Sequence, residues 1–202
     1  MGQQKNRGGR DKTSPSGRLR IVAGKWRSRL LPVADEDGLR PTPERVRETL
    51  FNWLSPEIEG CRCLDLFAGT GALGLEALSR GARSCTFVER ASEPVRLLRE
   101  NIRLLDATGA TVRQGDAATI IRSLKGEKFD VIFLDPPFAD DLLEDLCRLL
   151  AKSDLLKCGS KIYLEQEREQ KYPQLPMGWV AQKDKLAGNV RYTLAQVQEL
   201  TE

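Results

Sequence analysis

The chain has 202 residues, 40% of them hydrophobic and 30% charged, which suits one good-sized domain with a buried core. No apolar stretch approaches the roughly 18 residues of a membrane span, the N-terminus lacks an apolar signal region, and five irregularly spaced cysteines exclude a secreted disulfide framework, so we expect a cytoplasmic, reduced protein. The formal net charge is only +3, and the absence of histidine excludes Ser-His-Asp and Cys-His nucleophiles. Cys61 and Cys63 form a C-x-C pair that could suggest a metal, but no second pair of cysteines lies at a suitable spacing, so we expect no metal.

The basic residues are concentrated at the N-terminus. Residues 1–29 contain nine Lys or Arg and a single Asp, whereas the rest of the chain contains 23 basic and 28 acidic residues. We expect residues 1–17 to form a disordered basic tail, because they are rich in Gly, Ser and Lys/Arg and lack apolar periodicity. Residues 18–39 are expected to form a basic β-hairpin extension that turns at Gly24. Such a front end favours a polyanionic partner.

Residues 40–202 are expected to form the main domain, which begins with a helix. Thr42 has the residue type of an N-cap, and Pro43 suits the first helical position, where its missing N–H costs nothing. Apolar residues then recur on one helical stripe as far as Leu54, and Ser55-Pro56 ends the helix.

Strand and helix patterns alternate from residue 61 onward. Runs typical of strands cover residues 61–66, 84–88, 111–114, 129–134, 161–165, 179–186 and 190–197. Helical patterns cover residues 72–80, 93–105, 117–124 and 142–151, with Ser92 as the expected N-cap of the second. This alternation predicts an α/β fold with a mostly parallel seven-stranded sheet and helices on both faces. A Gly188-Asn189 turn predicts that the last two strands form an antiparallel hairpin.

Four consecutive strands of this predicted sheet end at an acid. The four residues are Asp65, Glu89, Asp116 and Asp135. Ligands of open parallel sheets bind outside the carboxyl ends of the strands, so we expect the four carboxylates to converge on one crevice. The alternative is that each acid only caps the helix that follows it.

The first of these turns contains a glycine-rich motif, G-x-G-x-x-G, that begins at Gly69 between a strand and a helix. Read literally, the motif is a dinucleotide fingerprint, but Asp65 would repel a pyrophosphate there. A ligand with an ammonium and a sulfonium, such as S-adenosylmethionine, would instead be attracted by a ring of carboxylates. Gly69 and Gly71 would then let the backbone approach the cofactor closely, and Glu89 could accept from ribose hydroxyls.

The fourth strand ends in the sequence Asp135-Pro136-Pro137-Phe138. The Asp135 carboxylate and the Pro136 carbonyl could hold the two N–H groups of an exocyclic amine and direct its lone pair at a methyl group. The prolines would stiffen the turn, and Phe138 would offer a face on which an extruded base can stack. Alone, Asp-Pro-Pro could be a simple strand-to-loop stop; after the glycine turn, we favour methyl transfer.

These motifs together resemble the Rossmann-like class I S-adenosylmethionine-dependent methyltransferases that act on exocyclic amines. The segments that carry the resemblance are residues 65–71, Glu89, residues 115–117 and residues 135–138. Arg40-Pro41-Thr42 and the helix after it are similar to the bacterial RsmD family in particular, as are residues 20–24 with Arg27. Members of that family methylate N2 of one guanine in a hairpin loop of small-subunit (16S) ribosomal RNA. The resemblance covers about residues 18–200.

The resemblance implies a role for each matching residue. Asp65, Phe67, Gly69 and Gly71 would contact the methionine end of the cofactor, Glu89 the ribose, and Asp116 with Ala117 the adenine. The target base would be held by Asp135, Pro136, Pro137 and Phe138; the last of these departs from the Tyr that related enzymes often carry, but can still stack. For RNA binding we expect a set of basic residues: Arg18, Arg20, Lys25, Arg27, Arg29, Arg40 and Arg45.

The expected partner is small-subunit ribosomal RNA, within the 30S subunit or an assembly intermediate, and the expected oligomeric state is a monomer. Trp26 could stack on an RNA base or pin the hairpin to the main domain. The alternative enzyme is an adenine-N6 methyltransferase on DNA or RNA, although no segment is long enough for the target-recognition insertion that such enzymes usually carry. An inert RNA-binding assembly factor is the alternative from another class. An NAD-dependent reductase would need a proton-donor set such as Tyr-x-x-x-Lys, which the chain lacks after the fourth strand.

Overall fold

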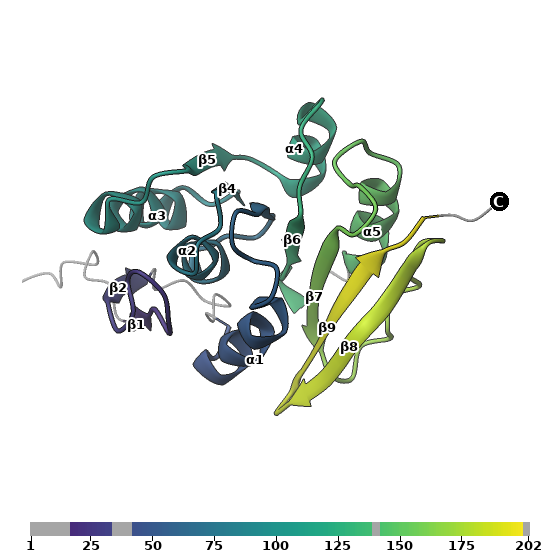
Figure 1. Ribbon diagram of the computed structural model, residues 1–202, viewed down its shortest axis with the longest axis horizontal. Coiled ribbons are helices and arrows are strands. Elements are labelled where there is room, and N and C mark those ends of the chain that lie inside the picture. Colours follow the sequence, from purple (N-terminus) through teal and green to yellow (C-terminus); the bar gives the residue numbers. More distant parts are fainter. Residues whose placement is uncertain (1–16, 34–41, 139–141, 200–202) are drawn as a thin grey trace, which may run out of the picture.

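The computed structural model describes residues 17–33, 42–138 and 142–199 (Figure 1). Seven strands form one sheet in the order β5-β4-β3-β6-β7-β9-β8, in which the first five strands are parallel and β9 and β8 are antiparallel. The strands are β3 (Arg62–Asp65), β4 (Ser84–Glu89), β5 (Ala110–Gln114), β6 (Val131–Leu134), β7 (Lys161–Glu167), β8 (Trp179–Ala187) and β9 (Val190–Val197). The predicted fold class, including the C-terminal hairpin, is confirmed.

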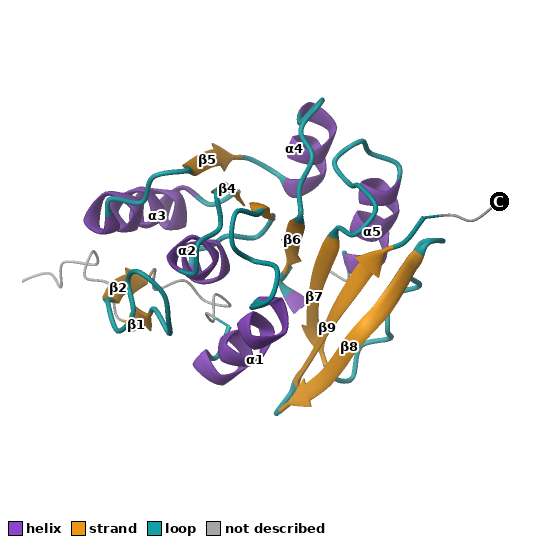
Figure 2. Ribbon diagram, in the orientation of Figure 1, coloured by secondary structure: helices purple, strands orange, loops and turns teal. Residues whose placement is uncertain are grey.

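Helices cover both faces of this sheet (Figure 2). They are α1 (Glu44–Leu54), α2 (Ala72–Ser79), α3 (Ser92–Leu105), α4 (Ala117–Ser123) and α5 (Leu143–Ala151). Strand side chains alternate between the two faces: Cys63 packs into the core under α1, α2 and α3, whereas Leu64 packs into the core under α4 and α5. None of the helices in the described ranges is long and apolar enough to cross a membrane.

Two helix starts differ from the sequence prediction. Helix α3 begins at Ser92 itself, after the extended residue Ala91, and has no side-chain cap. Helix α1 begins at Glu44, and no side chain caps it either. The Thr42 hydroxyl, expected to cap α1, is instead hydrogen-bonded to Asp135, 93 residues away. A charge-assisted bond to a carboxylate is stronger than a bond to a backbone amide, and the tertiary contact prevails over the local signal.

The N-terminal hairpin pairs β1 (Gly17–Arg20) with β2 (Leu30–Val33), antiparallel. Its strands are shorter and lie further apart in the sequence than a turn at Gly24 predicts, and Gly17 belongs to β1 rather than to the tail. Residues 21–29 form a connection that presses on α2, where a Cβ on Gly24 would lie 1.9 Å from the carbonyl oxygen of Ser79. Residues 1–16, predicted to be the tail, lie outside the described residues.

The buried carboxylate of Glu76 anchors this connection to the main domain. Its two oxygens accept from the backbone amides of Val22 and Ala23, at 2.8 and 3.0 Å. Arg80 lies 2.7 Å away and Arg47 3.5 Å away, and both ion pairs are shielded from water because Glu76 is 0% and Arg47 2% exposed. One carboxylate therefore joins the hairpin, α1 and α2.

Ser79 and Trp26 add to the attachment of the hairpin. The Ser79 hydroxyl donates to the Ala23 carbonyl and accepts from the Trp26 amide, while the Lys25 amide donates to the Ser79 carbonyl. Trp26 itself is buried in the core. Of its two expected roles, the structure therefore shows the pinning of the hairpin.

We expect Glu76→Ala to lower the free energy of unfolding by about 3 to 5 kcal/mol, because it leaves the Arg47 guanidinium buried without its partner. Urea denaturation of the purified variant would measure the loss. Glu127→Ala is the matched control, since Glu127 pairs with Arg62 at a partly exposed site and should cost less than about 1 kcal/mol. A Glu76→Ala loss no larger than that of the control would contradict the anchoring role.

Candidate active site

The site lies where the strand order of the sheet reverses. Strands β3 and β6 are paired side by side, and from this pair the chain continues outward to β4 and β5 in one direction and to β7 in the other. Ligands of open α/β sheets bind at the carboxyl ends of the strands at such a switch point. Asp65 ends β3 and Asp135 follows β6, so the two carboxyls face the same crevice from adjacent strands.

The glycine turn after β3 is held by Glu89. One Glu89 oxygen accepts from the Gly69 amide at 3.0 Å, and the other accepts from the Ala91 amide at 2.7 Å. Gly71 has a φ of +98°, and a Cβ there would lie 2.7 Å from side-chain carbons of Leu75 and Leu98. Only glycine fits that position, and the turn therefore keeps its backbone close to the start of α2.

The carboxyl of Asp65 is buried beneath this turn. Its side chain is 2% exposed and accepts from the amide of Gly74 in the first turn of α2 at 3.0 Å. The pKa of Asp65 is raised to about 7, chiefly by burial and also by the negative charges of Asp135 and Glu89, while the hydrogen bond from the Gly74 amide opposes the shift. A cationic ligand would relieve this accumulation of negative charge.

Three of the four predicted acids come together, and the fourth does not. Asp65 is electrostatically coupled to Asp135 and Glu89. Asp116 is exposed and caps α4 by accepting from the Thr119 amide at 3.0 Å. Asp116 therefore makes the helix cap that the alternative predicts, and Ala117 lies buried behind it.

Asp135 is oriented from the other side by the segment that leads into α1. The Thr42 hydroxyl donates to Oδ2 of Asp135 at 3.0 Å, and the Thr42 carbonyl accepts from the Arg47 guanidinium at 3.2 Å. Thr42 is only 4% exposed, so this contact is shielded from water. Burial raises the pKa of Asp135 to about 6, and the Thr42 hydrogen bond limits the rise.

Glu165 is a site residue that the sequence analysis missed. It lies on β7 beside Asp135, and its Oε2 accepts from the Tyr163 hydroxyl at 2.6 Å. Burial raises the pKa of Glu165 well above its ordinary value, and the negative charge of Asp135 adds to the effect. The signal was present in the sequence, because the predicted strand 161–165 also ends at an acid.

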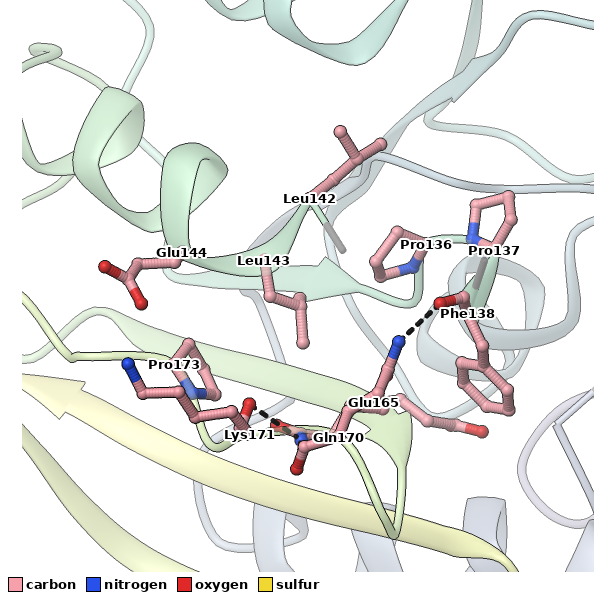
Figure 3. A pocket seen from close by; sticks show the side chains of 11 residues that line it. Pro136, Pro137, Phe138, Leu142, Leu143, Glu144, Glu165, Gln170, Lys171 and Pro173 are labelled. Carbon is pink, nitrogen blue, oxygen red and sulfur yellow. Dashed lines mark hydrogen bonds between the residues drawn. The ribbon is translucent and has the colours of Figure 1, made fainter. Parts of the chain in front are cut away.

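A pocket of about 130 Å³ opens beside the Pro136–Phe138 turn that follows Asp135 (Figure 3). Its walls come from the Pro136–Phe138 turn, the start of α5 and the end of β7. The Gln170 amide donates to the Phe138 carbonyl and ties this turn to the segment after β7. Pro136 is buried, Pro137 is exposed and Phe138 is half-buried, so the turn forms one wall of the pocket.

The predicted RNA-binding residues in the described ranges lie on the surface of the hairpin and of α1. They are Arg18, Arg20, Lys25, Arg27, Arg29 and Arg45, all exposed; Arg40 lies outside the described residues. Two of them also make protein contacts: Arg20 lies 3.9 Å from Glu44, and Arg29 donates to the Leu104 carbonyl. Within the described residues, no group of acids and cysteines has an arrangement that could hold a metal ion.

The fold and the acid-lined glycine turn define a class I S-adenosylmethionine-dependent methyltransferase. Residues 19–196 match the family model described as conserved hypothetical protein 95. The chain is 46% identical to ribosomal RNA small subunit methyltransferase D of Escherichia coli K12, over 91% of this chain and 92% of that protein. The Haemophilus influenzae protein of the same name is 42% identical, over 89% and 94%.

A solved structure agrees with these matches. The Escherichia coli protein yhhF superposes with a TM-score of 0.83 at 42% identity, over 90% of this chain and 99% of that one. The chain therefore belongs to the ribosomal RNA small subunit methyltransferase D family, as the resemblance of its motifs indicated.

We expect Thr42→Val to shift the acid limb of the kcat/KM–pH profile for methyl transfer to higher pH, by about one unit. The pKa of Asp135 is about 6 while Thr42 donates to its carboxylate. Without that donor the pKa rises, so as the pH falls the active carboxylate becomes protonated at a higher pH than in the unaltered protein. Thr42→Ser should restore the profile. Thr49→Val, on α1 with its hydroxyl on the Arg45 carbonyl, should leave it unchanged. An unshifted limb in Thr42→Val would refute the positioning role.

Proposed function

We propose that this protein transfers the methyl group of S-adenosylmethionine to the exocyclic N2 amine of a guanine in small-subunit ribosomal RNA. The observation that supports this most directly is the Asp135–Phe138 turn, which borders a pocket beside the acid-lined crevice. The relatives named above are small-subunit ribosomal RNA methyltransferases, which supports the choice of nucleic acid.

The residues at this edge of the sheet suit the cofactor in chemistry. The buried, electron-rich oxygens of Asp65 suit the ammonium of the methionine end, beside Phe67 and the close backbone at Gly69 and Gly71. Glu89 retains lone pairs for the ribose hydroxyls after accepting its two backbone amides. Asp116 and Ala117 begin α4 after the next strand outward, where they would border the adenine.

The base-side residues would hold and orient the amine. When bound, the cofactor supplies an electrophilic methyl on a sulfonium. Asp135 and the Pro136 carbonyl accept the two N–H groups of the amine, which directs its lone pair at that methyl. As the N–C bond forms and the S–C bond breaks, the nitrogen becomes acidic and its proton passes to Asp135 or to water. Most of the rate enhancement would come from in-line alignment.

The target base must leave its stack to reach this turn. Bases in RNA loops are extruded at low cost, and Phe138 offers an aromatic face for the extruded base. The pocket between the turn, α5 and the end of β7 is the space that the base would enter (Figure 3). Pro136 and Pro137 limit the movement of the turn while the base is held.

We propose that the substrate is the RNA within the 30S subunit or an assembly intermediate, and that the protein acts as a monomer. The exposed arginines and Lys25 of the hairpin would contact phosphates around the target loop. Adenine-N6 methylation and an inert assembly role remain the competing functions. The intact Asp65, Glu89 and Asp135 arrangement argues against the inert role.

Transfer of labelled methyl from S-adenosylmethionine to small-subunit particles, naked ribosomal RNA and DNA, followed by nucleoside analysis, tests this function. We expect N2-methylguanine from particles. Asp135→Ala should reduce transfer on the order of 1000-fold while cofactor affinity stays within about threefold, because Asp135 holds the amine rather than the cofactor.

Three results would contradict the proposal or the role of Asp135 in it. Methyladenine in place of N2-methylguanine would show an adenine-N6 enzyme. Cofactor binding without transfer to any of the three substrates would favour the assembly factor. Full activity of Asp135→Ala would refute the role of Asp135 in holding the amine.

We expect the double variant Arg18→Gln/Arg27→Gln to weaken RNA binding and to reduce the slope of log Kd against log salt concentration by about 1 to 2, since each lost phosphate contact lowers the slope by roughly 0.7 to 0.9. Filter binding at several salt concentrations would measure this. Arg83→Gln is the control, because Arg83 is exposed just before β4, at the opposite end of the strands from the site. Identical slopes for the unaltered protein and the double variant would exclude phosphate contacts by these two residues.

A further inference from the structure

We propose that Glu165 selects guanine over other bases by accepting the N1–H of the target base while Asp135 holds its N2 amine. This inference rests on the proposed function, and it names the residue that would determine which amine-bearing base is accepted. The position, the burial and the hydrogen bonding of the Glu165 side chain all support this role.

Glu165 lies beside the amine-holding turn. The pairing of β6 with β7 aligns Leu134 with Leu164, so the next residues, Asp135 and Glu165, follow adjacent parallel strands at the same edge. Glu165 is 3% exposed and lines the same pocket as Phe138, and Figure 3 shows its side chain extending toward the Phe138 ring. A base stacked on Phe138 would therefore present its edge to both carboxyls.

The orientation of the Glu165 carboxyl is fixed by a hydrogen bond from Tyr163. The Tyr163 hydroxyl donates to its Oε2 at 2.6 Å, and Tyr163 is itself fully buried. The rings of Phe133 and Tyr192 lie 6.4 and 6.5 Å from the Tyr163 ring, on either side in the packed core. A carboxyl held in this way is pre-organised to receive a donor from the pocket.

The half-buried carboxyl of Asp135 and the buried carboxyl of Glu165 need hydrogen-bond donors. The Thr42 hydroxyl lowers the pKa of both Asp135 and Glu165, but its single proton can serve only one of them at a time. The free energy cost of burying these groups falls when N–H donors reach them. An entering ligand with two adjacent N–H donors would satisfy both carboxyls.

The pocket also contains a further acceptor without a partner. The Gln166 amide nitrogen donates to the backbone carbonyls of Gln170 and Lys171, which fixes the orientation of the amide. Its Oε1 is buried and has no partner among the described residues. Glu165 and Gln166 thus place two side-chain acceptors on neighbouring residues of β7.

This distribution of acceptors distinguishes between the two candidate bases. The Watson–Crick edge of guanine carries adjacent donors, N1–H and the N2 amine, whereas that of adenine places the acceptor N1 beside the N6 amine. An adenine held by Asp135 would turn its N1 lone pair toward Glu165, and the ionised carboxyl of Glu165 would then face it as a second acceptor, which is unfavourable. The pair Asp135 and Glu165 therefore suits guanine.

Particles reconstituted with either guanine or 2,6-diaminopurine at the methylated position test the inference. Diaminopurine keeps the N2 amine and replaces N1–H with an acceptor. The unaltered protein should favour guanine on the order of 100-fold in kcat/KM. Glu165→Gln should lose most of this preference, because its amide can donate to N1 of diaminopurine, while cofactor affinity stays within about threefold. Glu127→Gln, outside the pocket lining and paired with Arg62, is the matched control and should keep the preference.

The outcomes separate the inference from the function on which it rests. The inference alone would be overturned if the protein methylates guanine N2 but Glu165→Gln leaves its preference for guanine over diaminopurine unchanged. An equal loss of kcat/KM for both bases in Glu165→Gln would have the same meaning. Methylation of adenine by the unaltered protein would overturn the proposed function and the inference with it. If Glu165→Gln does not fold, Tyr163→Phe takes its place. This variant keeps the Glu165 carboxyl but removes the hydrogen bond that orients it, and should reduce the preference for guanine over diaminopurine severalfold.

Discussion

The buried carboxylate of Glu76 is the contact on which the arrangement of this protein depends. It satisfies two backbone amides of the hairpin connection and the charges of Arg47 and Arg80 at once. A buried charge is tolerated only where such partners surround it. Moving any one of them away would leave the Glu76 carboxylate partly unpaired in the core, and this cost in free energy holds all of the partners in place. The hairpin is thereby a fixed part of the main domain and not a loosely tethered appendage.

Arg47 links Glu76 to the candidate active site. Its guanidinium lies against Glu76, donates to the Arg20 carbonyl of the hairpin and to the Thr42 carbonyl, and Thr42 in turn donates to Asp135. Four residues from three separate segments of the sequence (Thr42 with Arg47, Glu76 and Asp135) thus form one chain of polar contacts. The Asp135–Phe138 turn is stiffened by its prolines, and the Thr42 hydrogen bond from the segment before α1 constrains it a second time.

Local patterns were sufficient for the sheet, the glycine turn and the Asp135–Phe138 turn, because alternation, strand ends and proline act within a few residues. They failed at Thr42, whose residue type suits a helix cap but whose hydroxyl is used by a partner 93 residues away. Glu76 gave no local signal, because an acid within a helix is usually solvated. The sequence does contain a signal for Glu165: the predicted strand 161–165 ends at an acid, as do the four strands that lead to the predicted carboxylates.

Helix α2 connects two parts of the site that act on different molecules. Its first turn begins at the glycine turn, which we propose to border the cofactor, and its last residue, Ser79, binds the hairpin that we propose to contact phosphate. Eight helical residues span about 12 Å. The length of one rigid helix therefore sets the spacing between the methyl donor and the RNA backbone. Relatives of this fold that gain or lose a turn in this helix would place the two at a different spacing, and would need a target loop of different geometry.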